Sequence, residues 1–276
     1  MSAIVLGDES GYLDGENQKM KLAAIESMWH TEAAPASFTV FGFPDQAKHE
    51  IRDSVKIPFV LGIIATRSLY TSIPGIDDLV NKNEQRIIQG IPAYRALQTL
   101  IKDPNNESAK LTLRKEQSNL GYSLLLKRYT PNVVDATPAQ IKQAAWDTVP
   151  NVPVIFWSFR IMVACAFFFL GVFALAFYFS CKRTLEKKWF LWLAACSLPL
   201  PWVASELGWV VAEYGRQPWA IDGVLPTFLG TSTLATTDLW ISLSGFVVFY
   251  TLLAVVEIYL MVKYIRLGPE YLAVVE

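Results

Sequence analysis

The chain has 276 residues, of which 53% are hydrophobic and only 18% are charged, and its mean hydropathy is +0.30. Soluble domains carry about 25% charged residues, so this composition argues against an ordinary soluble protein and favours one with membrane segments. The formal net charge of −1 gives no electrostatic reason for a nucleic-acid partner, and we expect none.

The charged residues are unevenly distributed along the chain. Most Lys, Arg, Asp and Glu residues lie in 1–152, whereas Phe, Leu, Val, Ala and Trp dominate 153–276. We interpret 1–13 as the end of a preceding transmembrane helix with the start of an outer loop, 14–152 as an extracytoplasmic loop, and 153–276 as three transmembrane helices. The expected fold class is mainly α, a polytopic membrane helix bundle with a long, mostly helical extracytoplasmic loop domain.

The outer loop shows helical periodicity and one extended piece. The stretch PASFTVFGFP, Pro35–Pro44, predicts the extended piece. Thr137 is a suitable N-cap for the last helix, because Pro138 then takes the first helical position. The helices are predicted at Gln18–Met28, Asp77–Leu100, Ala109–Leu126 and Thr137–Val149.

Three apolar segments are long enough to cross a membrane, since a spanning helix needs about 20 mostly apolar residues. They lie at about 154–181, 189–214 and 239–265. Pro199 and Pro201 should kink the second span, because each proline removes a backbone donor and clashes with the preceding turn.

The short loops predict the orientation. The connection CKRTLEKK and the C-terminal flank with Lys263 and Arg266 are basic, which places both in the cytoplasm. Residues 14–152 and the loop Gly215–Asp238 then lie outside. The first residues do not resemble a signal peptide, so we interpret SAIVLG as the end of a preceding span and the chain as part of a larger membrane protein.

Four residues of the second span share one helical face. Trp202, Glu206, Trp209 and Glu213 are spaced by four, three and four. Because a carboxylate in a membrane is costly, such acids usually face a bundle interior, pair with a cation or serve a function. A site inside the bundle is one interpretation. The alternative is an interfacial aromatic belt beside acids that reach water.

Two residues near the outer end of the first span are candidates for a cofactor site. Arg160 would favour an anion such as a carboxylate or phosphate, because its planar guanidinium matches their geometry. Met162 could be an axial ligand to heme iron, although a lone methionine in a span is usually core filler.

In the outer loop, Lys21 and Glu26 are five residues apart, about 140° around a helix, so they cannot form an i,i+4 pair. On spacing alone they are two solvated charges. His30 and His49 match no metal-ligand pattern, and we expect both to be solvated.

Several separate stretches together resemble one family. These are GDESGY at 7–12, KLAAIE at 21–26, LLLKRYTPN at 124–132, FRIMVAC at 159–165 and GWVVAEYGRQPWAI at 208–221. They resemble the heme-bearing subunit I of cytochrome bd-type ubiquinol oxidases, in the family's order and over essentially the whole chain. The chain looks like the C-terminal part of that subunit, and its outer loop looks like the quinol-binding Q loop in its long form.

The resemblance implies a terminal quinol oxidase of the bacterial inner membrane. Such an enzyme oxidises ubiquinol at the periplasmic face and reduces O2 to water, generating proton-motive force without pumping. The implied cofactors are a low-spin heme b (b558), a high-spin heme b (b595) and heme d. The implied partners are subunit II, a small accessory subunit and membrane lipid, with ubiquinol and O2 as substrates. The C-terminus would be cytoplasmic.

The resemblance also implies roles for single residues. Lys21 and Glu26 match residues of quinol binding and oxidation. Met162 matches an axial ligand of the low-spin heme iron, with Arg160 as its cationic neighbour. In the second span, Glu213 matches the axial ligand of the high-spin heme b iron, and the residues matched around the high-spin hemes are Trp209 and Arg216.

The family's histidine heme ligands have no match in this chain, so we expect the chain to be inactive by itself. The rival hypothesis is a non-enzymatic polytopic membrane protein, such as a sensor or assembly factor with an extracytoplasmic domain. Such a protein would need neither Met162 nor Glu213.

Overall fold

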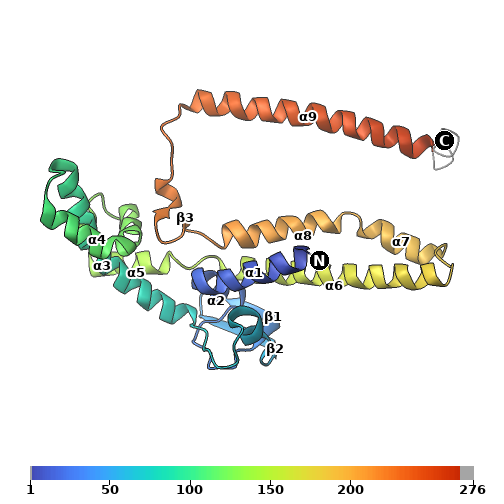
Figure 1. The fold of residues 1–276 in the computed structure, drawn as a ribbon, viewed down its shortest axis with the longest axis horizontal. Helices are drawn as coiled ribbons and strands as arrows, with labels where there is room; N and C mark the ends of the chain where they lie inside the picture. Colours follow the sequence, from blue (N-terminus) through green and yellow to red (C-terminus); the bar gives the residue numbers. More distant parts are fainter. Residues whose placement is uncertain (1, 268–276) are drawn as a thin grey trace. The chain divides into compact units, whose positions relative to one another are not determined.

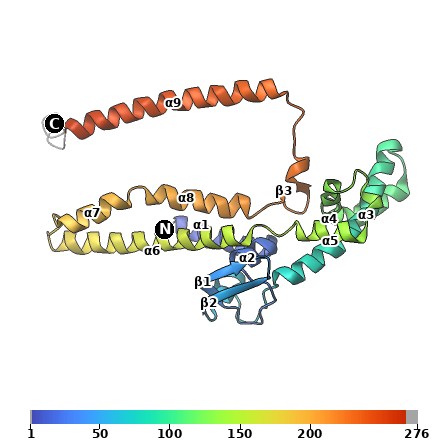
Figure 2. The same ribbon diagram turned by 180° about the vertical axis from the view of Figure 1, so that it is seen from behind.

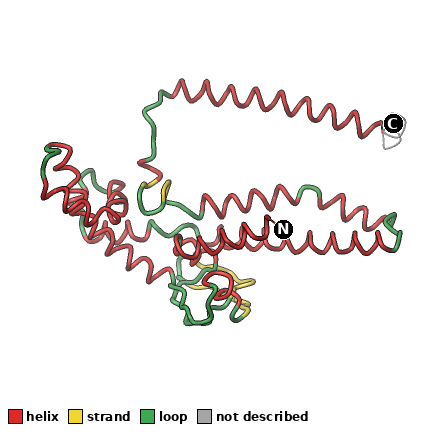
Figure 3. The backbone as a smooth tube through the Cα atoms, viewed as in Figure 1, coloured by secondary structure: helices red, strands yellow, loops and turns green. Residues whose placement is uncertain are grey.

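A computed structural model describes residues 2–267 of the chain (Figure 1). The chain divides into two compact units, Met1–Gly230 and Thr231–Glu276, and each is described by itself. Helix is the dominant secondary structure, with two short hairpins of strands, which confirms the predicted mainly α fold class (Figure 3).

The first unit begins with two helices, α1 (Ser2–Asn17) and α2 (Lys19–Ile25). Helix α1 continues past Leu13, where the outer loop was expected to begin. The predicted helix Gln18–Met28 is confirmed in a shorter form, since α2 ends at Ile25 and Ser27 has a positive φ of 50°. Helix α2 is short but mostly buried, so its side chains take part in the core.

An antiparallel hairpin of β1 (Phe38–Asp45) and β2 (Glu50–Ile57) follows. Strand β1 confirms the extended piece predicted at Pro35–Pro44. Strand β2 was not predicted, although apolar residues alternate with charged ones at its end. The hairpin contacts the first part of α6 (Val152–Cys181), so the outer loop packs on the beginning of a membrane span.

Three helices complete the outer loop: α3 (Ile76–Lys102), α4 (Glu107–Leu124) and α5 (Pro138–Trp146). All three predicted helices are confirmed, with ends shifted by a few residues. Helices α3 and α4 pack together as a helical hairpin, and a 3-10 turn, Leu125–Arg128, extends α4. Thr137 caps α5 in a capping box with Gln140, and Pro138 occupies the first turn as predicted.

The larger of two buried hydrophobic clusters in the described part of the outer loop lies among its helices, and a smaller one lies around Met28, Leu61 and Ile73. The most completely buried side chains of the larger cluster come from α3, from the turn after α4, from the segment before α5 and from α6; they include Ile76, Ile87, Leu126, Val133 and Ile155. Burial of each such side chain contributes about 1.5–3 kcal/mol. Because α6 contributes to the larger cluster, the outer loop is anchored directly to a membrane span.

Three segments are long and apolar enough to cross a membrane: Val152–Cys181, Lys188–Tyr214 and Thr236–Leu267. They confirm the three predicted spans. The second span runs beside α6 and consists of α7 (Lys188–Ser197), α8 (Leu200–Trp209) and a π-helical turn, Val210–Tyr214 (Figure 2). The helix is interrupted between Ser197 and Leu200, where the prolines predicted a kink.

The chain after the second span forms a small hairpin of β3 (Trp219–Ile221) and β4 (Leu225–Pro226). Its turn contains Gly223, which has a positive φ of 64°. The turn lies directly on α4, since a Cβ atom added to Gly121 would be 2.1 Å from the carbonyl oxygen of Gly223. Glycine at position 121 therefore lets this hairpin dock on the outer loop.

The second unit contains helix α9 (Thr236–Leu267). None of its described side chains is buried within the unit. A helix that is apolar on all sides is typical of membrane-embedded helices, which bury their side chains against lipid or other spans.

Candidate functional site

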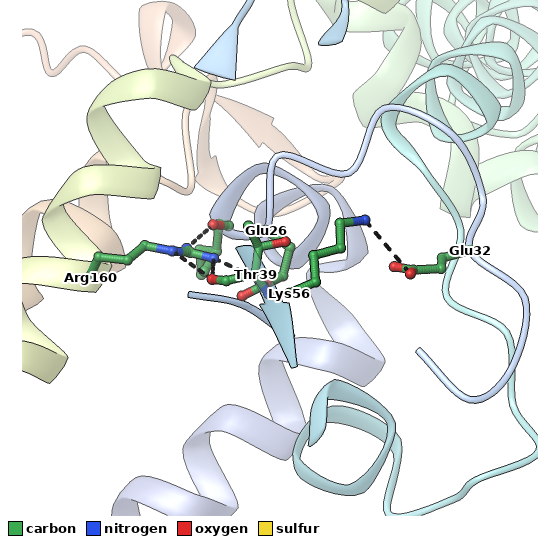
Figure 4. Close-up of polar contacts among 6 residues, drawn as sticks. Glu26, Glu32, Thr39, Lys56 and Arg160 are labelled. Atoms are coloured by element: carbon green, nitrogen blue, oxygen red, sulfur yellow. Dashed lines mark hydrogen bonds and ion pairs between the residues drawn. The ribbon is translucent and has the colours of Figure 1, made fainter. Parts of the chain in front are cut away.

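A buried ion pair joins the outer loop to the first span. The side chains of Glu26, directly after α2, and Arg160, on α6, are 2% and 7% exposed. Arg160 Nη2 lies 3.0 Å from Glu26 Oε2, and the backbone N–H of Thr39 also donates to this oxygen at 3.0 Å (Figure 4). Two charges buried so deeply require such pairing, because an isolated buried charge is very costly.

Arg160 holds three segments together. Its Nε and Nη2 atoms donate to the carbonyl oxygen of Thr39 at 3.1 and 2.6 Å, and its Nη1 donates to the carbonyl oxygen of Ile25. The guanidinium carbon lies 3.8 Å from the ring centroid of Phe156 on the same helix. Helix α6, strand β1 and the end of α2 therefore meet at this one side chain.

Burial and pairing act in opposite directions on the protonation of Glu26. Burial raises the pKa of this carboxyl above its ordinary value, and the neighbouring Arg160 and the Thr39 N–H oppose that shift. A carboxyl whose pKa is raised holds a proton to a higher pH than an ordinary glutamate and can exchange that proton with a bound substrate. The site combines a titratable group with a fixed cation.

Lys21 is also buried, but it lies in a different place from Glu26. Its side chain is packed against Gly215 and lines a cavity of about 260 Å³. The cavity lies between the α1–α2 junction, α3, α4 and the chain after the second span. Basic residues outnumber acidic ones in its lining. The basic residues are Lys19, Lys21, Lys82, Arg86 and Arg216, and the acidic residues are Glu16 and Asp222.

The structure therefore corrects the interpretation of Lys21 and Glu26 as solvated charges. Both are buried, at 6% and 3% exposed, because the short helix α2 and the residue after it are enclosed by other elements. The two residues do not form one cluster. Glu26 pairs with Arg160, whereas Lys21 shares the cavity with Arg216.

Met162 lies at the contact between α6 and α8. Its side chain is partly buried, and a Cβ atom added to Gly208 would be 3.2 Å from its Sδ atom. The absence of a side chain at Gly208 therefore gives space for the sulfur. Met162 is two residues from Arg160, so the sulfur and the buried ion pair belong to the same two turns of α6.

Glu213 and Arg216 form an ion pair at the end of the second span. Glu213 lies in the π-helical turn, a feature that often marks functional positions in helices. Their side chains are 38% and 34% exposed. Among the described residues, the buried Nε atom of Arg216 has no hydrogen-bond partner, so one donor of this guanidinium remains available.

The remaining residues of the predicted stripe are exposed in the described structure. Trp202 and Trp209 are 72% and 65% exposed, and Glu206 is exposed as well. The described residues of the first unit leave most of their surface uncovered. The structure thus brings Glu213 and Arg216 together but does not enclose Trp209.

The histidines form a cluster that sequence reasoning missed. His30 Nδ1 and His49 Nδ1 lie 3.1 and 3.4 Å from the two carboxylate oxygens of Asp77. His30 is 82% exposed, as expected, whereas His49 is 37% exposed and stacked on Trp29 at 4.8 Å, so it is only partly solvated. Within residues 2–267, no group of three or more His, Cys, Asp or Glu side chains is arranged to hold a metal ion.

Comparison with known proteins identifies the family. The sequence profile of the family described as "Cytochrome bd terminal oxidase subunit I" matches residues 1–269. The chain belongs to this family. The resemblance that was inferred from the separate sequence stretches is therefore confirmed, and the three apolar helices agree with a membrane subunit.

Two relatives of the cytochrome bd family show the extent of the match. The chain is 40% identical over 271 residues to cytochrome bd-II ubiquinol oxidase subunit 1 of Escherichia coli (strain K12), which covers 98% of the chain and 53% of that protein. It is 24% identical over 258 residues to cytochrome bd ubiquinol oxidase subunit 1 of Bacillus subtilis (strain 168), covering 93% and 43%. The chain thus spans about half the length of these relatives.

Proposed function

We propose that this chain forms part of a terminal quinol oxidase of the bacterial inner membrane, which oxidises ubiquinol at the periplasmic face and reduces O2 to water. Its membership of the cytochrome bd family and the ubiquinol oxidase activity in the names of its relatives support this function. A sensor or assembly factor is not favoured by the same comparisons. The structural observation that carries the proposal is the buried Glu26–Arg160 pair, which links the outer loop to the span of Met162.

In this proposal, residues 14–152 are the Q loop on the periplasmic side, and residues 153–276 provide the three membrane helices. The basic connection after α6 and the basic flank of α9 support a cytoplasmic position for those ends and for the C-terminus. The Q loop is then at the outer end of α6, where its core includes the first turns of that helix.

The proposed roles in quinol oxidation differ between the two loop residues. Lys21 binds the quinol, a role supported by its place in the lining of a mainly basic cavity. Glu26 accepts the quinol proton, and Arg160 holds its carboxylate in a fixed position through the Nη2 contact. A proton released from Glu26 leaves on the outer side. This sidedness, with protons for water formation drawn from the cytoplasm, generates proton-motive force without pumping.

The side chains near the two spans fit heme binding. Met162 offers a partly accessible thioether, and Glu213 offers a carboxylate that is more than one-third exposed. We assign Met162 to the iron of low-spin heme b558 and Glu213 to the iron of high-spin heme b595. When bound, these hemes and heme d supply the one-electron chemistry between quinol and oxygen.

Three further residues would surround the hemes. Arg160 makes four hydrogen bonds within the described structure, and since a guanidinium has five N–H donors, one remains for a heme propionate. The Nε atom of Arg216 is available in the same way. Trp209, with its exposed ring, would pack beside the high-spin hemes.

The proposed partners are those of the family. Subunit II and a small accessory subunit would cover apolar surface of the three spans, together with membrane lipid. The exposed apolar side chains of α9 provide such a surface.

The experiment that tests the function is a reduced-minus-oxidised visible spectrum of the purified oxidase that contains this chain within its full-length subunit, combined with ubiquinol-dependent O2 uptake. We expect signals of low-spin heme b, high-spin heme b and heme d, and O2 uptake that requires quinol. A protein that contains no heme, or that takes up no O2 with quinol, would contradict the proposal.

A further inference from the structure

The β1–β2 hairpin has an exposed apolar face. On β1, Phe41 and Phe43 are 41% and 49% exposed, and on β2, Val55 and Ile57 are 58% and 46% exposed. Phe41 and Val55 are cross-strand partners, so their side chains share a face of the hairpin. An exposed group of four large apolar side chains on two neighbouring strands indicates a surface that is covered in the functional protein.

This face continues onto a membrane span through Trp157. The ring of Trp157, in α6, lies 5.4 Å from the ring centroid of Phe41 and 6.1 Å from that of Phe43. Along α6, Val154, Trp157 and Ile161 are spaced by three and four, so they share one helical face. Val154 and Ile161 are themselves 42% and 43% exposed. The hairpin face and the outward face of α6 therefore form one continuous apolar surface.

The position along α6 places this surface at the membrane boundary. The helix has 30 residues, about 45 Å at 1.5 Å per residue, whereas the hydrocarbon core of a bilayer is about 30 Å thick. The first turns of α6 therefore lie at headgroup depth when its apolar centre spans the core. Trp157 lies in those turns, and tryptophan is enriched at this depth because its ring is amphipathic.

Two basic residues of the hairpin are held in ion pairs. Lys56, which alternates with Val55 and Ile57, pairs with Glu32 of the preceding loop at 3.7 Å (Figure 4). Arg52 pairs with Asp45 across the turn end of the hairpin at 3.1 Å. Lys56 and Arg52 thus have partners within the loop, whereas Phe41 and Phe43 remain 41% and 49% exposed.

We propose that Phe41, Phe43, Val55, Ile57 and Trp157 form a lipid-contact face that lies in the boundary between headgroups and acyl chains of the outer leaflet. Phospholipid is the partner because the face continues the lipid-depth surface of α6 and contains aromatic rather than charged side chains. The contact fixes the hairpin, and with it Thr39 and the Glu26–Arg160 pair, at the membrane surface. This inference does not depend on the proposed oxidase activity.

The test is site-specific photo-crosslinking in the membrane. Benzoylphenylalanine is introduced in place of Phe41, or in place of Phe43, in the intact protein reconstituted into liposomes of phosphatidylethanolamine and phosphatidylglycerol. The same probe in place of Tyr70, which is 93% exposed and lies outside the face, is the matched control. After illumination, mass spectrometry of the labelled peptide distinguishes lipid adducts from crosslinks to protein.

We expect several-fold more lipid adduct at positions 41 and 43 than at position 70. Crosslinks from 41 and 43 to another protein segment, whether of this subunit or of a partner, would overturn the proposal. Lipid adducts no more frequent than at position 70 would overturn it as well. Because each probe replaces one aromatic side chain with another, the hairpin is expected to keep its fold.

Discussion

The guanidinium of Arg160 lies 3.0 Å from the carboxylate of Glu26, although 134 residues separate them in the chain. The pair connects the end of the short helix α2 to the third turn of the membrane span α6. Taking both charges out of water is costly, so the pair is not a simple source of stability. Its consequence is that neither residue can be changed alone without leaving a buried charge.

The first prediction is a strong energetic coupling within this pair. Replacing Arg160→Met leaves the Glu26 carboxyl without its cation, and Glu26→Gln leaves the guanidinium without its anion. Each single change should destabilise the protein, by about 3–5 kcal/mol where one member of a buried pair is removed. The double variant should be more stable than the sum of the two changes predicts. The measurement is Tm of the detergent-solubilised protein.

The control for this cycle is the exposed pair of Arg52 and Asp45, whose side chains are 59% and 16% exposed. The variants Arg52→Met and Asp45→Asn should change Tm little and add independently, since such pairs contribute about 0–1 kcal/mol. The prediction would be contradicted if the two cycles showed equal coupling. It would also be contradicted if the Tm changes of Arg160→Met and Glu26→Gln were purely additive.

The second prediction concerns proton transfer at Glu26. Glu26→Gln should slow quinol oxidation and leave O2 reduction with an artificial electron donor close to normal, because an amide keeps the shape but cannot accept a proton. Glu32→Gln is the matched control, since Glu32 is an acid of the same loop that pairs with Lys56. A parallel loss of both activities in Glu26→Gln would indicate a structural role instead.

The pH dependence follows from the raised pKa of Glu26. Only the ionised carboxylate accepts a proton, so quinol oxidation should increase as the pH rises through this pKa, at a pH above the ordinary range of a glutamate. The free energy of unfolding should instead decrease as the pH rises through this pKa. A group with a raised folded-state pKa stabilises fully below its unfolded pKa and loses that contribution as the pH rises. Both dependences should be absent in Glu26→Gln.

Helix positions and spans were largely predictable from the sequence, because they depend on local patterns. Long apolar runs identify α6 and α9 without tertiary information, and Thr137 with Pro138 identifies the start of α5. The division of the second span was predictable from its prolines. The same local rules did not predict β2, in which Arg52 and Lys56 find partners only after the loop has folded.

The site was less predictable, because it depends on contacts between distant segments. No spacing rule connects Glu26 to Arg160, or Lys21 to Arg216. The burial of Lys21 and Glu26 results from the packing of α6, α3 and the β3–β4 hairpin around a helix of 7 residues. Family resemblance assigned roles to these residues, whereas the structure adds which of them lie together.

The third prediction concerns Met162. Met162→Leu should remove or strongly weaken the low-spin heme signal while the protein stays folded and inserted, because leucine keeps the volume and lacks the sulfur. Met261→Leu is the control, since Met261 is an exposed residue of α9. The measurement is the reduced-minus-oxidised spectrum together with the midpoint potential of the low-spin heme. An unchanged spectrum and potential would exclude Met162 as a ligand.

The last prediction concerns Glu213, which pairs with Arg216 in the π-helical turn. Glutamine at this position keeps the size and hydrogen-bonding capacity but removes the negative charge that an iron centre favours. Glu213→Gln should therefore remove the high-spin heme b, and the adjacent heme d with it, while the low-spin heme at Met162 remains. The measurement is heme content and the difference spectrum of the purified protein.

Glu206→Gln provides the matched control, because Glu206 lies on the same predicted face of the second span and is exposed. If Glu213 were only an interfacial acid paired with Arg216, both glutamine variants would behave alike, since a partly exposed ion pair contributes little. Retention of all hemes in Glu213→Gln would then exclude the Glu213 carboxylate as a ligand of the high-spin heme. Selective loss of the high-spin heme in Glu213→Gln, but not in Glu206→Gln, would show that the Glu213 carboxylate binds the heme iron.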